Sequence, residues 1–142
     1  MTLVLDAAPL VAVADRRDPM HASIAAVLRD EPGELIVPAP VTAEVDYLLG
    51  RRLGREARLA FLDDLAAGRF TVGGLDAADH AVVAGLERHY EDLDVGLADL
   101  SVVVLAARYQ TRRLLTFDER HFRAIRPISG SHFTLLPMDG LR

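Results

Sequence analysis

Apolar residues along this chain gather in short continuous runs and in longer stretches with three- and four-residue spacing. The short runs mostly lack alternating polarity, which is typical of strands that are covered on both faces. They predict strands at Thr2–Leu5, Leu35–Val37, Phe70–Val72, Leu114–Phe117 and Phe133–Leu136. The longer stretches predict helices at Pro9–Ala14, His21–Arg29, Val41–Arg52, Arg55–Ala67, Ala77–Tyr90, Ala98–Tyr109 and Glu119–Ala124.

Strands and helices alternate, a pattern that predicts a parallel sheet with right-handed crossovers and helices on both faces. Gly54 separates the third and fourth helices, Gly68 ends the fourth, and Pro40 opens the third at a position where a missing N–H costs little. We therefore expect an α/β fold, with three α/β/α layers around a parallel sheet of about five strands. The 142 residues contain no linker-like stretch, and this predicts a single domain over residues 1–142.

Composition excludes several kinds of chemistry. Cysteine is absent, so no disulfide or thiolate metal site can form, and all 16 basic residues are Arg, which disfavours phosphate loops and Schiff-base enzymes that need Lys. No apolar run approaches the roughly 20 residues of a membrane span, and the N-terminus lacks a basic signal region, so we expect a soluble cytoplasmic protein without membrane contact. The net charge of -5 opposes indiscriminate nucleic-acid binding but is compatible with a nuclease whose negative site is neutralised by metal.

Four carboxylates, Asp6, Glu44, Asp99 and Asp118, lie at a boundary or in the first turn of apolar segments. Asp6 and Asp118 follow expected strands, whereas Glu44 and Asp99 fall in the first turns of expected helices. Ligands of open parallel sheets bind beyond the carboxyl ends of the strands, so this topology lets all four meet. Oxygen-only ligands suit Mg²⁺ or Mn²⁺. Asp94 is a further acid that could supplement or replace Asp99.

Each of these residues also has an ordinary structural interpretation. Asp after a strand is commonly a helix cap, and Glu in a first turn complements the helix dipole. Thr42, Ser101 and Thr116 could orient a carboxylate, but capping or strand packing accounts for them equally well. We interpret His121 as structural or substrate-lining rather than as a metal ligand.

Arginines that follow Asp118 are candidates for phosphate binding. Arg120 and Arg123 are the best placed, although a solvated helix face is the ordinary interpretation of any single Arg. The first, third and fourth expected helices also carry more apolar residues than one small sheet needs, and this indicates a groove for a partner helix or a dimer contact.

Four motifs occur in order along the chain: Leu3-Val4-Leu5-Asp6, Thr42-Ala43-Glu44-Val45, Gly96-Leu97-Ala98-Asp99-Leu100-Ser101 and Leu115-Thr116-Phe117-Asp118-Glu119-Arg120-His121-Phe122. Together they resemble the PIN-domain ribonucleases, and more narrowly the VapC toxins of toxin-antitoxin modules. The resemblance implies a metal-dependent endoribonuclease that cleaves RNA, with a catalytic and metal-binding quartet at Asp6, Glu44, Asp99 and Asp118. It also implies a VapB-like antitoxin partner and a homodimer.

Other functions remain open on sequence alone. One is a PIN-like nuclease with a housekeeping role in RNA processing. Another is a non-catalytic protein-binding module in which the carboxylates are only caps. An aspartyl-phosphate phosphatase fits poorly, because Asp6-Ala7-Ala8 lacks a second Asp and the chain has no Lys.

Overall fold

The computed structural model describes residues 2–141 and has a five-stranded sheet at its centre. The strands are β1 (Thr2–Leu5), β2 (Glu34–Pro38), β3 (Thr71–Gly73), β4 (Arg113–Leu115) and β5 (Thr134–Leu136). Their order is β3-β2-β1-β4-β5, and all neighbours are parallel. The chain steps outward from β1 to β2 and β3 and then crosses to β4 on the other side of β1. The strand order therefore reverses between β1 and β4, the position where open α/β sheets bind ligands.

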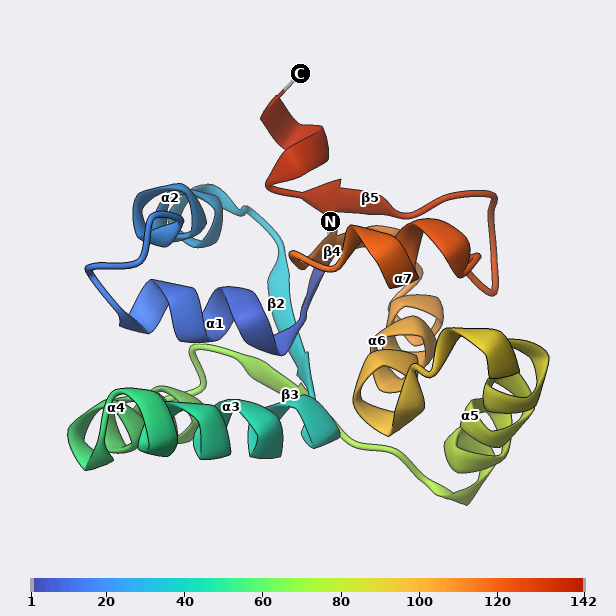
Figure 1. Ribbon diagram of the computed structural model, residues 1–142, viewed down its shortest axis with the longest axis horizontal. Coiled ribbons are helices and arrows are strands. Elements are labelled where there is room, and N and C mark those ends of the chain that lie inside the picture. Colours follow the sequence, from blue (N-terminus) through green and yellow to red (C-terminus); the bar gives the residue numbers. More distant parts are fainter. Residues whose placement is uncertain (1, 142) are drawn as a thin grey trace.

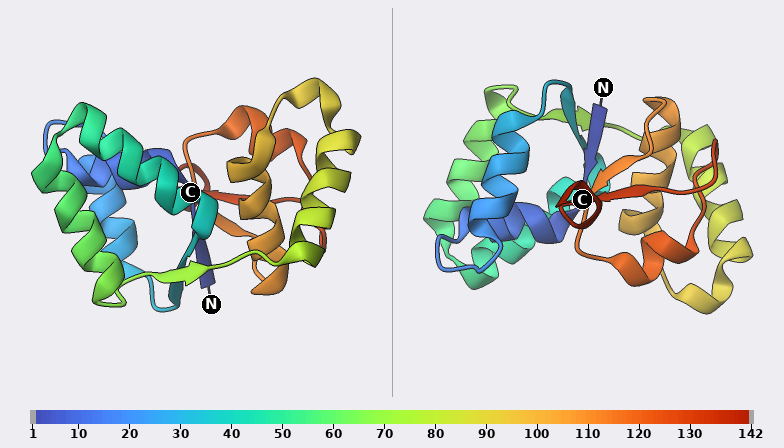
Figure 2. Two further views of the ribbon diagram at one scale, coloured as in Figure 1. Left: turned by 90° about the horizontal axis from the view of Figure 1, so that it is seen from below. Right: turned by 90° about the horizontal axis from the view of Figure 1, so that it is seen from above.

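Helices cover both faces of this sheet. They are α1 (Ala7–Ala14), α2 (His21–Asp30), α3 (Ala39–Arg52), α4 (Arg55–Ala66), α5 (Ala77–His89), α6 (Gly96–Arg108) and α7 (Glu119–Ala124), with short 3-10 turns η1 (Glu91–Leu93) and η2 (Met138–Leu141). Helices α1 to α4 lie on one side of the sheet and α5 to α7 on the other (Figures 1 and 2). This is the three-layer α/β/α arrangement that the sequence predicts. Across the described residues, no helix combines the length and the apolar character needed to cross a membrane.

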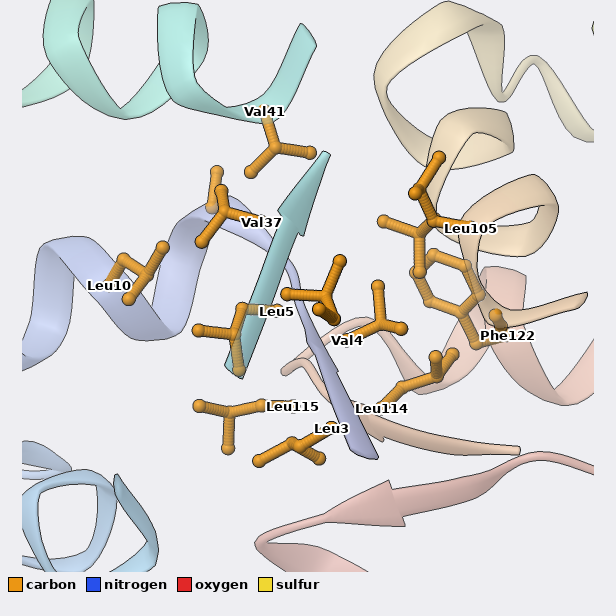
Figure 3. Packing of buried hydrophobic residues seen from close by; sticks show 14 of the residues in the cluster. Leu3, Val4, Leu5, Leu10, Val37, Val41, Leu105, Leu114, Leu115 and Phe122 are labelled. Atoms are coloured by element: carbon orange, nitrogen blue, oxygen red, sulfur yellow. The ribbon is translucent and has the colours of Figure 1, made fainter. Parts of the chain in front are cut away.

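The core is divided by the central strand. Leu3 and Leu5 point toward the layer that contains α1 and α2, whereas Val4 points toward α6 and Phe122, so successive β1 residues fill opposite layers (Figure 3). All three are fully buried. Burial on both faces explains why β1 is a continuous apolar run rather than an alternating one.

Most element boundaries agree with the sequence, and the differences have local causes. Helix α1 begins at Ala7, two residues before the expected Pro9, because Asp6 caps it and proline is tolerated in a first turn. Helix α3 begins at Ala39, directly after β2, so its first turn contains no acidic residue. The expectation that Glu44 lies in the first turn is therefore wrong: it lies in the second. Strand β4 ends at Leu115 rather than at Phe117.

Candidate metal centre

Asp6 follows β1 directly, and both its backbone N–H and its carboxylate form hydrogen bonds. Its N–H donates to the Leu115 carbonyl at 2.9 Å, which ties the strand end to β4. One carboxylate oxygen, Oδ1, caps α1 by accepting from the Ala7 N–H at 2.9 Å, and the other, Oδ2, accepts from the Thr116 hydroxyl at 2.7 Å. Only 7% of Asp6 is exposed, and burial raises its pKa, with the charge of Asp118 adding to the effect.

Thr116 connects two of the carboxylates. Its fully buried hydroxyl donates to Asp6 Oδ2 and accepts from the Asp118 N–H at 3.0 Å. Strand packing alone would have accounted for this residue equally well from the sequence. The structure instead makes it the link that fixes Asp6 relative to the loop after β4. The available signal was its position two residues before Asp118.

Asp118 and Asp99 face each other across His121. Asp118 caps α7 by accepting from the His121 N–H at 2.9 Å, and its Oδ2 lies 2.7 Å from the His121 Nδ1. Asp99, in the first turn of α6, has its Oδ2 3.6 Å from the same nitrogen. Burial raises the pKa of Asp99 to about 7, and the negative charges of Asp6 and Asp118 contribute.

Glu44 completes the cluster from helix α3. Its pKa is raised by partial burial and by the charge of Asp6. Its charge in turn contributes to the raised pKa of Asp99. The structure therefore places all four predicted acids, from the residue after β1, from α3 and α6, and from the start of α7, where their charges act on one another near the reversal of the sheet order.

This cluster fits a hard divalent cation. One ligand atom from each of Asp99, Asp118 and His121 lies within 4.8 Å of the others, a span that a single ion can bridge. Asp6 and Glu44 lie near enough to act electrostatically on Asp99, and carboxylate oxygens are the ligand type of Mg²⁺ and Mn²⁺. Acids with raised pKa values repel one another when all are ionised, and a cation removes that repulsion. The donor set and its electrostatics therefore favour metal.

Several residues highlighted by the sequence lie outside this cluster. Asp94 is exposed, in a left-handed conformation with φ 52°, and the charges acting on Asp99 are those of the other quartet members and His121. The hydroxyls of Ser101 and Thr42 each donate to a carbonyl three residues earlier at 2.6 Å, so they serve their own helices.

The two arginines expected to bind phosphate differ from each other. Arg123 is held by Asp139, with N–O distances of 2.8 and 3.0 Å, and by Glu119 at 2.8 Å, and these contacts raise its pKa. Its guanidinium is thus already engaged by carboxylates. Arg120 is exposed and forms no ion pair with the described residues.

The fold and the acidic cluster define a class. Residues 3–126 match the PIN domain family, and the chain belongs to that family. More narrowly, it is 40% identical over 135 residues to Ribonuclease VapC26 of Mycobacterium tuberculosis, covering 95% of this chain and 100% of the relative.

Solved structures agree on the fold. The crystal structure of Mycobacterium tuberculosis VapC20, a sarcin-ricin loop cleaving toxin, has a TM-score of 0.77 at 16% identity and covers 83% of this chain and 91% of that one. The structure of VapBC2 from Rickettsia felis, bound to a DNA fragment from its promoter, has a TM-score of 0.69 at 17% identity. The match covers 95% of this chain and 98% of that one.

Proposed function

We propose that this protein is a metal-dependent endoribonuclease and the toxin component of a type II toxin-antitoxin system. The observation that carries the proposal is the convergence of Asp6, Glu44, Asp99 and Asp118 at the sheet reversal of a PIN-family chain. The relation to Ribonuclease VapC26 supports both the activity and the toxin role. We also propose that residues 1–142 form one domain and that this domain acts in the cytoplasm.

The four carboxylates hold Mg²⁺ or Mn²⁺, the ions that best match oxygen donors. When bound, such an ion supplies Lewis-acid activation of water and neutralises charge at the scissile phosphodiester. Thr116 keeps Asp6 oriented, and His121 keeps Asp118 oriented toward Asp99. The burial of Asp6 limits the rotamers of that carboxylate, so the cluster is preorganised before RNA binds.

The antitoxin partner is proposed to occupy an apolar groove on the face of the sheet that α1 to α4 cover. A cavity of about 330 Å³ lies there, and its lining includes Leu10, Val13, Leu49, Phe61 and Phe70. Leu59 and Leu62 on α4 are also exposed. These residues suit the apolar side of a VapB-like segment, and the toxin itself is proposed to form a homodimer.

Cleavage of total RNA by purified protein tests this function. We expect cleavage with Mg²⁺ or Mn²⁺ that chelator abolishes, and at least a hundredfold loss in Asp6→Asn, roughly the scale of removing a key electrostatic group. Asp94→Asn is the matched control, because it also removes one carboxylate but from outside the cluster. Chelator-resistant cleavage, or an active Asp6→Asn protein, contradicts the proposal.

A further inference from the structure

Helix α3 presents an exposed aromatic ring, Tyr47, three residues after Glu44. Tyr47 is 59% exposed, and in the described part of the chain no other Phe or Tyr is exposed to a comparable extent. Every other aromatic of this type is at least partly buried, so Tyr47 is a large apolar surface that the fold leaves in water. Aromatic rings in that position commonly serve a ligand or a partner.

The ring belongs to the same side of α3 as Glu44. Val41, Val45 and Leu49 form the buried side of the helix, and Glu44 and Tyr47, three residues apart, both lie on the exposed side. Side chains at this spacing are neighbours, and a helical side chain leans toward the helix N-terminus. Tyr47 therefore covers the turn that carries Glu44.

Beyond Tyr47 the same side of α3 becomes basic. Arg51 lies four residues after Tyr47, about 10 Å along the axis from Glu44 at the usual helical rise. Arg51, Arg52 and Arg55 are exposed and form no ion pair with any described residue. By contrast, Arg58 pairs with Asp46. In a chain with a net charge of -5, these arginines offer unneutralised positive charge close to the site.

Helix α3 also runs in the required direction. It begins near the carboxyl ends of the central strands and extends away from α6 (Figure 1). A carboxylate, an aromatic ring and a guanidinium thus follow one another outward from the cluster. Phosphate and base are the chemical groups that complement a guanidinium and a ring, respectively.

We propose that Tyr47 stacks on an unpaired nucleobase next to the scissile position and that Arg51 binds a backbone phosphate further along the same strand. The inference rests on the proposed nuclease function and adds a feature of the substrate: the RNA must be single-stranded where it leaves the site along α3. Bases in an A-form duplex are stacked on each other and are closed to such a ring. Stacking accepts every base, so Tyr47 selects for unpaired structure rather than sequence.

Kinetics on a short single-stranded RNA of mixed sequence test the stacking role. We expect Tyr47→Ala to raise KM roughly tenfold with kcat within about twofold, because stacking contributes equally to ground and transition states. Tyr47→Trp should restore KM, whereas Tyr47→Leu, which keeps apolar surface without a ring face, should not. Unchanged KM in Tyr47→Ala, or full rescue by Tyr47→Leu, overturns the proposal.

Salt dependence tests the phosphate contact. We expect Arg51→Ala to weaken RNA binding and to reduce the slope of log affinity against log salt by about one. Arg88→Ala, on α5, is the matched control, because it removes an exposed arginine outside α3. Equal slopes in Arg51→Ala and Arg88→Ala overturn the contact.

Two further measurements distinguish base stacking from catalysis and from a dimer contact. Fluorescence anisotropy with the same labelled RNA reports binding directly. A wild-type protein that binds through Tyr47 without cleaving defeats the nuclease proposal and supports only the contact between Tyr47 and RNA. Light scattering reports mass: if Tyr47→Ala dissociates a dimer and lowers cleavage only for that reason, Tyr47 contacts a second copy and the stacking proposal is wrong.

Discussion

The Thr116 hydroxyl and the Asp6 carboxylate, 110 positions apart in sequence, meet in a buried hydrogen bond of 2.7 Å. The bond joins the ends of β1 and β4, the two strands between which the sheet order reverses. The same hydroxyl accepts from the Asp118 N–H. One side chain therefore contacts both Asp6, which follows β1, and Asp118, which lies in the segment after β4.

Thr116→Val tests this coupling. Valine keeps the shape but removes the hydroxyl, so Asp6 Oδ2 and the Asp118 N–H both lose a partner. We expect metal affinity and kcat/KM to fall by roughly 10- to 100-fold, as for other groups that orient metal ligands. Titration calorimetry with Mn²⁺ and cleavage kinetics measure the two effects. Thr116→Ser keeps the hydroxyl and should stay close to wild type; equal losses in both variants would assign the effect to packing.

The raised pKa of Asp99 predicts a pH-dependent stability in chelator. Folded Asp99 keeps its proton up to about pH 7, whereas the unfolded chain releases it near the ordinary value of 3.8. Between pH 3.8 and about pH 7 the folded state therefore binds more protons than the unfolded chain. The stability that this proton contributes is fully present below pH 3.8 and is lost as the pH rises through about 7. We expect Tm in chelator to fall over this range.

Asp99→Asn and added metal are the controls for the expected fall of Tm with rising pH. The variant should flatten the dependence, because the titrating group is gone. Saturating Mn²⁺ should reverse the fall near neutral pH, with about 2.7 kcal/mol of stabilisation at a hundredfold excess over Kd. A Tm in chelator that rises with pH across this range contradicts the electrostatic account of the cluster.

The groove between α1, α3 and α4 predicts a separable binding defect. Ala60 is exposed and lines the cavity, so Ala60→Arg should block an inserted apolar segment without disturbing the core. We expect antitoxin affinity to fall at least tenfold, a loss of about 1.4 kcal/mol, while cleavage by the free protein is kept. Ala78→Arg, at an exposed position of α5, controls for the added charge and bulk. Unimpaired binding by Ala60→Arg would place the partner elsewhere.

An ion pair away from the site predicts a purely structural effect. Arg113 Nη1 contacts both carboxylate oxygens of Glu31, at 2.6 and 2.8 Å, and the Glu31 side chain is only 1% exposed. Arg113→Met leaves that carboxylate buried without compensation, at an expected cost of about 3–5 kcal/mol. Denaturant unfolding should show the loss, and adding Glu31→Gln should recover most of it. A fully stable Arg113→Met protein contradicts this burial cost.

Much of the fold was predictable because local patterns determine it. Continuous apolar runs such as Leu3–Leu5 indicate strands covered on both faces, and helical spacing places α1 to α7 to within a few residues. Gly54, with φ 99°, separates α3 from α4 where the chain needs a conformation that other residues resist. Local patterns do not encode the strand order, which depends on how the crossovers pack.

The sequence positions of the four candidate acids could be predicted, but the residues that hold these acids in place could not. Asp6 and Asp118 follow strands β1 and β4, Asp6 directly and Asp118 three residues after the strand ends, so the sequence could place them at the same edge of the sheet. The contacts of Thr116 and His121 depend on distant segments meeting, and the pairing of Arg123 with Asp139 depends on the C-terminal turn. A capping role for Asp6 also leaves room for another contact, because Asp6 caps α1 with one oxygen and accepts from the Thr116 hydroxyl with the other.

Anomalous diffraction from a crystal soaked with Mn²⁺ tests the central claim most directly, because it locates the ion without reference to activity. We expect a manganese peak at the carboxyl ends of β1 and β4, within about 2.0–2.3 Å of oxygens from at least two of Asp6, Glu44, Asp99 and Asp118. Strong manganese peaks only elsewhere on the molecule, with the four carboxylates in contact solely with protein and water, would contradict the account.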